Sequence, residues 1–577
     1  MINIREGGED RDFMTAHALI EYSRELAQCV RCFPSFRSDM SRTFPLTEGQ
    51  YNHWSALRNH PIGRNPVYIQ HRISGELNIP QFITALKGCV TDHEALRVGI
   101  TLGSDGRLVQ WVREVPEGKD LIDCRQVASK DEEQFSHYAR NVLMADLQKD
   151  WHLAEELPFQ FRLLRHSESV HAFLATFSHL AVDGTGRALF ARDLWQRYRE
   201  LEEGNDLAAG VPVSFESVVQ ERLRASRERS DSSRDSFWES RAAAAPPTFQ
   251  AFEGVGPSDG AQSCVLKRLN WREAALAALR DRSRAAGVTE FQWILAAFVA
   301  TLFEFTEQDL VKLTIPVDTR RWAERSVVGM FMVPLPVVLE RPTEPGGLVR
   351  QVKRELLAVI AHRDLSVETF AAIRQVSRER WGAHRACGIS INHLGGRQVE
   401  EDMRTPSVLV QTGPYWPDFA YETDGVSLQV RCDQDETALR LVFLESLFSD
   451  AGSEKFLEIL RARAYDVDIF QSKKDEEGNS TPCEDGRKRE SLKDSLGRSV
   501  VSVDVAEIAA GLATIPGVAA ADVEVENHRD GGTALRATAR AAVGTDIDDL
   551  YARLRAAEPD TPGLVIPGNV VVVRATA

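Results

Sequence analysis

The chain has 577 residues, more than the roughly 250–300 residues that one hydrophobic core supports, so we expect three compact units. Hydrophobic residues make up 43% and charged residues 27%, a composition that excludes a wholly disordered chain. The formal net charge of −16 argues against a protein that binds nucleic acid or an anionic membrane.

The first residues of the chain lack the apolar core that a secretory signal needs. The longest apolar segment, residues 291–305, is interrupted by Gln292 and Glu304. It is shorter than the about 20 residues of a membrane span, so it predicts a buried helix. The eight cysteines are scattered, as is typical of reduced cytosolic proteins. We therefore expect a cytoplasmic protein without a membrane partner.

Residues 1–40 are expected to form an N-terminal extension with one helix, at residues 13–27. Cys29 and Cys32 follow this helix. No second Cys or His pair stands at the spacing of a zinc site. The pattern therefore favours two ordinary thiols, with a metal or redox site as the alternative.

Residues 41–208 and 209–470 each alternate strand-like and helix-like segments, which predicts two mixed α/β units. Within the second unit, the polar segment 225–235 predicts a surface loop or a solvated helix face. The clearest predicted elements of the first unit are strands at residues 67–73 and 171–177 and helices at residues 79–93 and 185–201.

Residues 471–484 are charged and rich in small residues, which predicts a linker. Beyond it, residues 485–577 are rich in Ala and Val. They predict strands at 523–525 and 570–573 around a helix at 547–554, and so a small separate α/β module. Few contacts are expected to cross the boundary between this module and the preceding units.

One loop carries a pattern of catalytic chemistry. His179 and Asp183 follow an apolar strand and precede an amphipathic helix, a position where catalytic side chains are often displayed. An imidazole exposed on such a loop can take or give a proton near neutral pH. Asp183 can hold the loop by pairing with a cation, and Gly184 permits backbone conformations closed to other residues. The spacing alone favours a structural histidine, with a catalytic one as the alternative.

The segment SHLAVDG, residues 178–184, resembles the HHxxxDG motif of the condensation domains of nonribosomal peptide synthetases. These domains belong to the chloramphenicol-acetyltransferase-like superfamily. Five other signatures of the family appear in the family's order, and the resemblance covers residues 41–470. They are LTEGQ (46–50) with Trp54, DHEALR (92–97), VGMFMVPLP (328–336), HRDLSVE (362–368) and INHLGG (391–396).

The chain departs from the family pattern at three places, one of which is Thr185, where the family has a small apolar or aromatic residue. Ser178 replaces the first motif histidine, whereas His179, the mechanistic one, is kept. Val333 and Pro334 stand where the family usually has Asn and Thr, which favours a specialised branch. Four other residues of the motifs are expected to pack and hydrogen-bond rather than to catalyse: Gln50, Arg97, Glu368 and Asn392.

The resemblance implies a fold of two chloramphenicol-acetyltransferase-like lobes in a V-shaped pseudo-dimer, with His179 in a tunnel between them. It implies that His179 accepts a proton from the acceptor or positions it, and that the backbone N–H of Gly184 stabilises the oxyanion. Ser178 and Asp183 are structural in this scheme. Asp183 pairs with an arginine, for which Arg320 is the first choice and Arg321 the second.

The implied activity is that of an acyltransferase of natural-product biosynthesis. It joins an acyl thioester to a small-molecule amine or hydroxyl and forms an amide or ester. The donor is carried on the phosphopantetheine arm of an acyl or peptidyl carrier protein that acts in trans, without an intrinsic cofactor or metal. The alternatives are an acyl-CoA-dependent O- or N-acyltransferase, an epimerase relative of condensation domains and a catalytically silent scaffold.

Residues 485–577 resemble the small C-terminal subdomain of adenylate-forming enzymes, in particular at IPGVAAADV, residues 515–523. The large subdomain that binds ATP in those enzymes is missing. The late catalytic lysine is absent too, because the only lysines of the module are Lys488 and Lys493. We therefore expect the module to dock or stabilise rather than to activate acids.

Overall fold

The structure is a computed structural model. It describes residues 42–59, 67–103, 107–205, 213–228, 232–244, 264–306, 308–384, 388–394, 402–413, 425–465, 490–494, 496–528, 531–556 and 565–574. The predicted N-terminal extension with Cys29 and Cys32 and the predicted linker at residues 471–484 lie outside these ranges.

The N-lobe is built on a six-stranded sheet in the order β13-β14-β2-β7-β6-β5. Its strand β7 is buried along its whole length, because helices cover both faces of the sheet. On one face α3 and α5 pack through Phe82 and Phe190, and on the other α4 packs through Leu143. The bounds are β2 Val67–Gly75, β5 Asp123–Gln126, β6 Phe159–Arg165, β7 Val170–Phe177, β13 Met403–Arg404, β14 Val408–Thr412, α3 Ile79–Asp92, α4 Glu132–Leu147 and α5 Gly184–Glu202.

The four elements that the sequence predicts most clearly in this lobe are present as β2, β7, α3 and α5. The polar segment 225–235 spans the end of α6 and the start of α7, so its described part is helical. A smaller three-stranded sheet, β1-β4-β3, lies beside the main one. The bounds are β1 Phe44–Pro45, β3 Val98–Leu102, β4 Leu108–Val112, α6 Phe215–Glu228 and α7 Ser232–Ala244.

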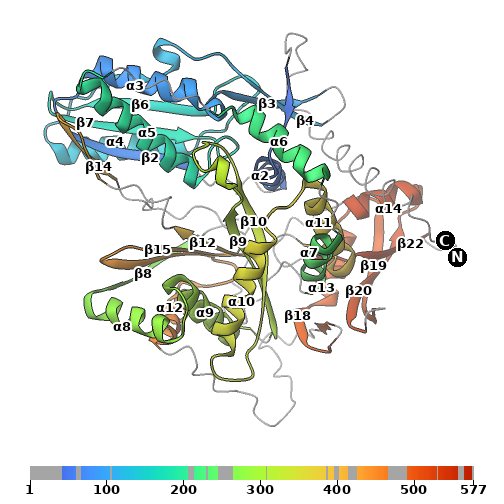
Figure 1. The fold of residues 1–577 in the computed structure, drawn as a ribbon. Coiled ribbons are helices and arrows are strands. Elements are labelled where there is room, and N and C mark those ends of the chain that lie inside the picture. Colours follow the sequence, from blue (N-terminus) through green and yellow to red (C-terminus); the bar gives the residue numbers. More distant parts are fainter. Residues whose placement is uncertain are drawn as a thin grey trace.

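The C-lobe is built on a second six-stranded sheet, in the order β10-β9-β12-β15-β16-β8. Helices α8, α9, α10 and α12 pack on the face turned away from the N-lobe, whereas α11 lies beside α7 (Figure 1). The bounds are β8 Cys264–Arg272, β9 Leu310–Asp318, β10 Met332–Glu340, β12 Ile389–Leu394, β15 Val426–Cys432, β16 Glu436–Leu444, α8 Glu273–Ala285, α9 Glu290–Glu304, α10 Gly347–Ala361, α11 Val367–Trp381 and α12 Asp450–Tyr465.

Helix α9 is the buried helix that the sequence predicts. Thr289 and Gln292 form a capping box at its start, and its residues from Trp293 to Phe303 are buried. Among the described helices, none is by itself long and apolar enough to cross a membrane. In the part of the chain that the structure describes, one pair, α8 and α9, reaches that length and apolarity when taken together, and it is bent by 93°.

The two lobes exchange elements, so no single cut in the sequence separates them. Strand β14, which follows the C-lobe strand β12, pairs with β2 of the N-lobe through Val410 and Ile73. Helix α2, Glu48–Asn59, lies between the lobes at the centre of the molecule (Figure 1). The N-lobe sheet therefore contains strands, β13 and β14, that lie between C-lobe strands in the sequence.

The C-terminal module consists of a two-stranded sheet, β17-β18, and a three-stranded sheet, β19-β20-β22, with α13 and α14. Its strands 523–525 and 570–573 and helix 547–554 are present as parts of β19, β22 and α14. The bounds are β17 Glu490–Lys493, β18 Ser499–Val503, α13 Val505–Ala513, β19 Val518–Asn527, β20 Thr533–Ala541, α14 Ile547–Ala556, β21 Val565–Ile566 and β22 Asn569–Arg574.

The expectation of few contacts between module and lobes is wrong. The module's hydrophobic core includes Leu310 of β9 and Trp381 of α11. Strand β21 pairs with β11, Ala383–His384, and the guanidinium of Arg380 donates to the Thr533 carbonyl at 2.7 Å. Such small sheets cannot bury their own apolar side chains, so the C-lobe completes their core.

Deleting the module should destabilise the lobes. A variant that ends at residue 470 exposes Leu310 and Trp381, and each large apolar side chain contributes about 1.5–3 kcal/mol when buried. We expect the melting temperature to fall by several degrees in scanning calorimetry. The control is Leu496→Ser, because Leu496 is an exposed residue of the module. An unchanged melting temperature of the truncated protein would contradict this role.

Candidate active site

The loop after β7 forms a tight turn that presents His179. The backbone N–H of Ser178 donates to the Pro158 carbonyl at 2.8 Å, which holds the start of the turn. The carbonyl of Ser178 accepts from the N–H groups of Ala181 at 2.9 Å and Val182 at 3.2 Å. Ser178 is buried, so the structure places it in the frame of the turn.

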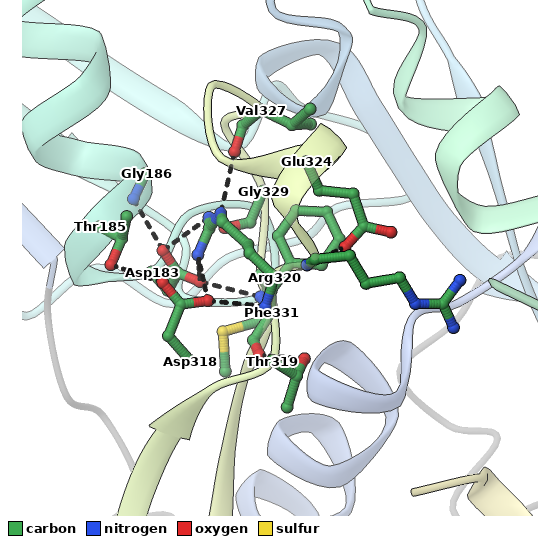
Figure 2. A network of polar contacts seen from close by, with 12 residues as sticks. Asp183, Thr185, Gly186, Asp318, Thr319, Arg320, Glu324, Val327, Gly329 and Phe331 are labelled. Atoms are coloured by element: carbon green, nitrogen blue, oxygen red, sulfur yellow. Dashed lines mark hydrogen bonds and ion pairs between the residues drawn. The ribbon is translucent and has the colours of Figure 1, made fainter. Parts of the chain in front are cut away.

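Asp183 ends this loop and caps helix α5. Its fully buried carboxylate accepts a hydrogen bond from the Gly186 N–H at 2.7 Å. It also accepts from the Phe331 N–H at 2.8 Å and from two nitrogens of Arg320, at 2.8 and 2.9 Å (Figure 2). One N-lobe side chain is therefore held by backbone and side-chain donors from both lobes.

Arg320 uses every N–H group of its guanidinium in this network. Besides Asp183, it donates to the carbonyls of Val327 at 3.1 Å and Gly329 at 3.0 Å and to the carboxylate of Asp318 at 3.2 Å. Burial disfavours the charge, but the two carboxylates outweigh it and raise the pKa of Arg320. The guanidinium is therefore a permanent cation inside the protein.

Arg321, the second choice for this pairing, binds a different carboxylate. Its guanidinium contacts the Asp364 carboxylate at 3.5 Å, and both side chains are partly exposed. The structure therefore brings Asp183 together with Arg320 and not with Arg321.

The first turn of α5 contacts the C-lobe directly. The Asp183 N–H donates to the Gly329 carbonyl at 3.1 Å, and the Thr185 hydroxyl donates to Asp318 at 3.1 Å. A Cβ atom on Gly186 would lie 3.2 Å from backbone atoms of Gly329, closer than most side chains tolerate. Gly184 is the first residue of α5, so its N–H has no acceptor within the helix.

Helix α2 contacts the same turn. Gln50 is buried and donates to the Leu180 carbonyl at 2.9 Å, next to His179. At the start of the helix, the Thr47 hydroxyl donates to the Met330 carbonyl at 2.7 Å. The helix is therefore attached both to the His179 loop and to the C-lobe segment that surrounds Arg320.

His179 is half-buried, and not exposed as the sequence suggests. The ring of His53, from α2, lies beside it, with 4.6 Å between the ring centroids and a tilt of 42°. Burial lowers the pKa of His179, and the Asp183 carboxylate and the backbone of the loop offset this only in part. The imidazole therefore favours its neutral form, in which one ring nitrogen accepts a proton.

His53 is not among the site residues that the sequence predicts. Its only signal is its place next to Trp54 in the first motif, and no spacing rule connects that motif with residue 179. The two histidines are 126 positions apart in the chain, so only the tertiary packing of α2 on the β7 loop brings them together.

The other motif residues lie apart from this turn. Arg97 donates to the backbone carbonyls of Val90 and Thr91. Glu368 is exposed in the first turn of α11, and Oδ1 of Asn392 on β12 is buried without a partner among the described residues. No group of three or more His, Cys, Asp or Glu residues in the described ranges is arranged to hold a metal ion.

Residues 40–464 match the Condensation domain family. An isonitrile lipopeptide synthase of Streptomyces coeruleorubidus is 25% identical over 379 residues, which are 63% of this chain and 24% of the synthase. Phosphinothricin tripeptide synthetase PhsB of Streptomyces viridochromogenes is 25% identical over 356 residues, 58% of this chain and 29% of that protein. The chain thus spans a small part of the curated relatives that it matches.

Solved structures show the same fold. The first condensation domain of the calcium-dependent antibiotic synthetase gives a TM-score of 0.60 at 20% identity, over 74% of this chain and 98% of that one. The X-domain from teicoplanin biosynthesis gives a TM-score of 0.59 at 18% identity, over 76% and 98%. The family match ends before residue 485, so the resemblance of residues 485–577 to adenylate-forming enzymes stays a prediction.

Removing Arg320 should destabilise the protein far more than removing its neighbour. Arg320→Ala leaves the buried Asp183 carboxylate unpaired, which costs about 3–5 kcal/mol of unfolding free energy. Arg321→Ala is the matched control, because a partly exposed ion pair contributes about 0–1 kcal/mol. Urea unfolding measures both. Equal losses of stability would show that the Asp183–Arg320 pair is not the stronger contact.

Proposed function

This chain belongs to the condensation domain family, and on that basis we propose that it joins an acyl group to an amine by condensation. The donor is an acyl thioester on the phosphopantetheine arm of a carrier protein, and the acceptor is a small-molecule amine or hydroxyl. The observation that carries the proposal is the His179 turn, which the Asp183–Arg320 network holds where the two lobes meet.

The reaction needs a nucleophile, a place for its proton and a donor to the oxyanion. The acceptor nitrogen attacks the thioester carbonyl, and a C–N bond forms while the carbonyl oxygen becomes negative. The C–S bond then breaks and the phosphopantetheine thiol leaves. The proton lost by the nitrogen passes through His179 to the sulfur, so atoms and charges balance.

The state of His179 suits this role. Its Nδ1 is shielded from solvent, which leaves Nε2 for the acceptor. Because burial disfavours the imidazolium, a hydrogen bond with partial proton transfer is favoured over a long-lived charged histidine. A neutral amine attacks a thioester with little more help than such a hydrogen bond, whereas a hydroxyl acceptor depends more strongly on His179 as a base.

Gly184 is the proposed donor to the oxyanion. Its N–H stands at the positive end of α5, a helix of 19 residues. Asp183 accepts from Gly186 rather than from Gly184, so the capping carboxylate leaves this N–H available. Asp183, Arg320 and Ser178 are structural residues that fix the turn.

For the remaining parts of the chain, we propose an N-lobe at 41–208 that also takes in β13 and β14, a C-lobe formed by the rest of 209–470 and a C-terminal module at 485–577. The contacts of the module with β9 and α11 support a stabilising role. The module contributes none of the residues that form the His179 turn.

Replacing His179 by Ala should abolish or greatly reduce condensation. The substrates are candidate carrier proteins loaded with an octanoyl group and offered an amine. Intact-protein mass spectrometry shows which carrier loses its acyl group, and octanoyl-CoA as donor distinguishes an acyl-CoA-dependent enzyme. Asn141→Ala, on the solvent side of α4, serves as a control. Undiminished turnover by a folded His179→Ala variant would exclude a catalytic histidine.

The pH dependence follows from the lowered pKa of His179. A ring with a lowered pKa is neutral at pH 7 and loses its function only as the pH falls through that pKa. We therefore expect the acid limb of kcat/KM to be centred below about 6.5, the ordinary histidine value. Rate profiles with a loaded carrier measure it. An acid limb at or above 6.5 would contradict the proposed environment.

A further inference from the structure

The His53 ring packs beside His179 and has no role in the mechanism above. The two centroids are 4.6 Å apart and the rings are tilted by 42°, the geometry of packed rings. No hydrogen bond connects these two residues, so a direct proton relay between them has no support. His53 therefore acts on His179 through packing.

The position of His53 is fixed by contacts at the start of α2. The Glu48 carboxylate pairs with the buried Arg222 at 3.2 Å, and the Thr47 hydroxyl is bound to the Met330 carbonyl. A Cβ atom on Gly49 would lie 2.9 Å from the Met330 and Met332 carbonyls, so this turn lies directly against the C-lobe. The start of α2, one turn before His53, is therefore held against the C-lobe.

The contact also fixes the electrostatic surroundings of His179. Two titratable groups face the His179 ring. One is Asp183 of the same loop, whose charge is balanced by Arg320 of the C-lobe, and the other is His53 of α2. Burial lowers the pKa of His53 well below the usual value, and a charge on His179 lowers it further. His53 therefore stays neutral when His179 takes up a proton, and it covers one side of that ring without adding charge.

We propose that His53 is a positioning residue, which fixes the orientation of the His179 ring and keeps water from its covered side. The proposal rests on the proposed function only in taking His179 as the catalytic residue. The position belongs to the first motif, so the motif contributes one wall of the site through this side chain.

Nuclear magnetic resonance titration of the histidine rings tests the proposal without a substrate. The signal of His179 is assigned by its loss in His179→Ala. In His53→Ala water reaches the ring, and we expect the pKa of His179 to rise toward about 6.5. In His53→Phe the packing is kept, and we expect no shift. If His53→Ala does not fold, His53→Gln takes its place with the same expected rise.

Kinetics with an octanoyl-loaded carrier give the second measurement. We expect His53→Ala to lower kcat/KM by about 10- to 100-fold, as for a small misplacement of a reacting group, and to move the acid limb upward. His53→Phe should retain most of the activity.

Two results would overturn the positioning role. The first is a His179 titration that is unchanged in His53→Ala. The second is a His53→Phe variant as inactive as His179→Ala, which would make the His53 imidazole a participant in the chemistry. A wild-type protein without turnover would refute the proposed function instead, and the titration would still decide the role of His53.

Discussion

The buried ion pair of Asp183 and Arg320 is the interaction on which the site depends. Asp183 caps the first helix after the central N-lobe strand, and Arg320 follows the C-lobe strand β9. Because every N–H of the guanidinium is bound, neither lobe can shift without leaving a buried charge unpaired. The pair fixes the start of α5, and with it both His179 and the N–H of Gly184.

Strands β9 and β10 extend this constraint across the C-lobe. They are paired along their whole length, from Asp318 and Met332 at the site to Leu310 and Glu340 at the far end. The C-terminal module packs against that far end through Leu310. A module without residues in the His179 turn thus supports the strand that leads to Arg320. This arrangement explains why the module shares a core with the lobe rather than standing apart.

The immediate surroundings of His179 combine an apolar cover with a compensated charge. Asp183 would strongly favour an imidazolium if it were unpaired, but Arg320 balances it, and the His53 ring displaces water. Both effects keep the histidine neutral. Such a ring serves a reaction in which the nucleophile is already reactive and needs orientation more than a strong base. The proposed reaction of an amine with a thioester is of this kind.

The sequence by itself determined the local elements and the turn that presents His179. The strand before Ser178, the helix after Asp183 and the buried helix α9 follow from short-range apolar patterns, which the tertiary structure does not alter. The motif resemblance also predicted the partner of Asp183. The tertiary structure alone decided the rest. It placed His53 beside His179, moved β14 into the N-lobe sheet and joined the module to Leu310 and Trp381. These contacts connect residues far apart in the chain. They depend on which apolar faces remain uncovered once the local elements have formed. The spacing of residues in the sequence does not record which faces those are.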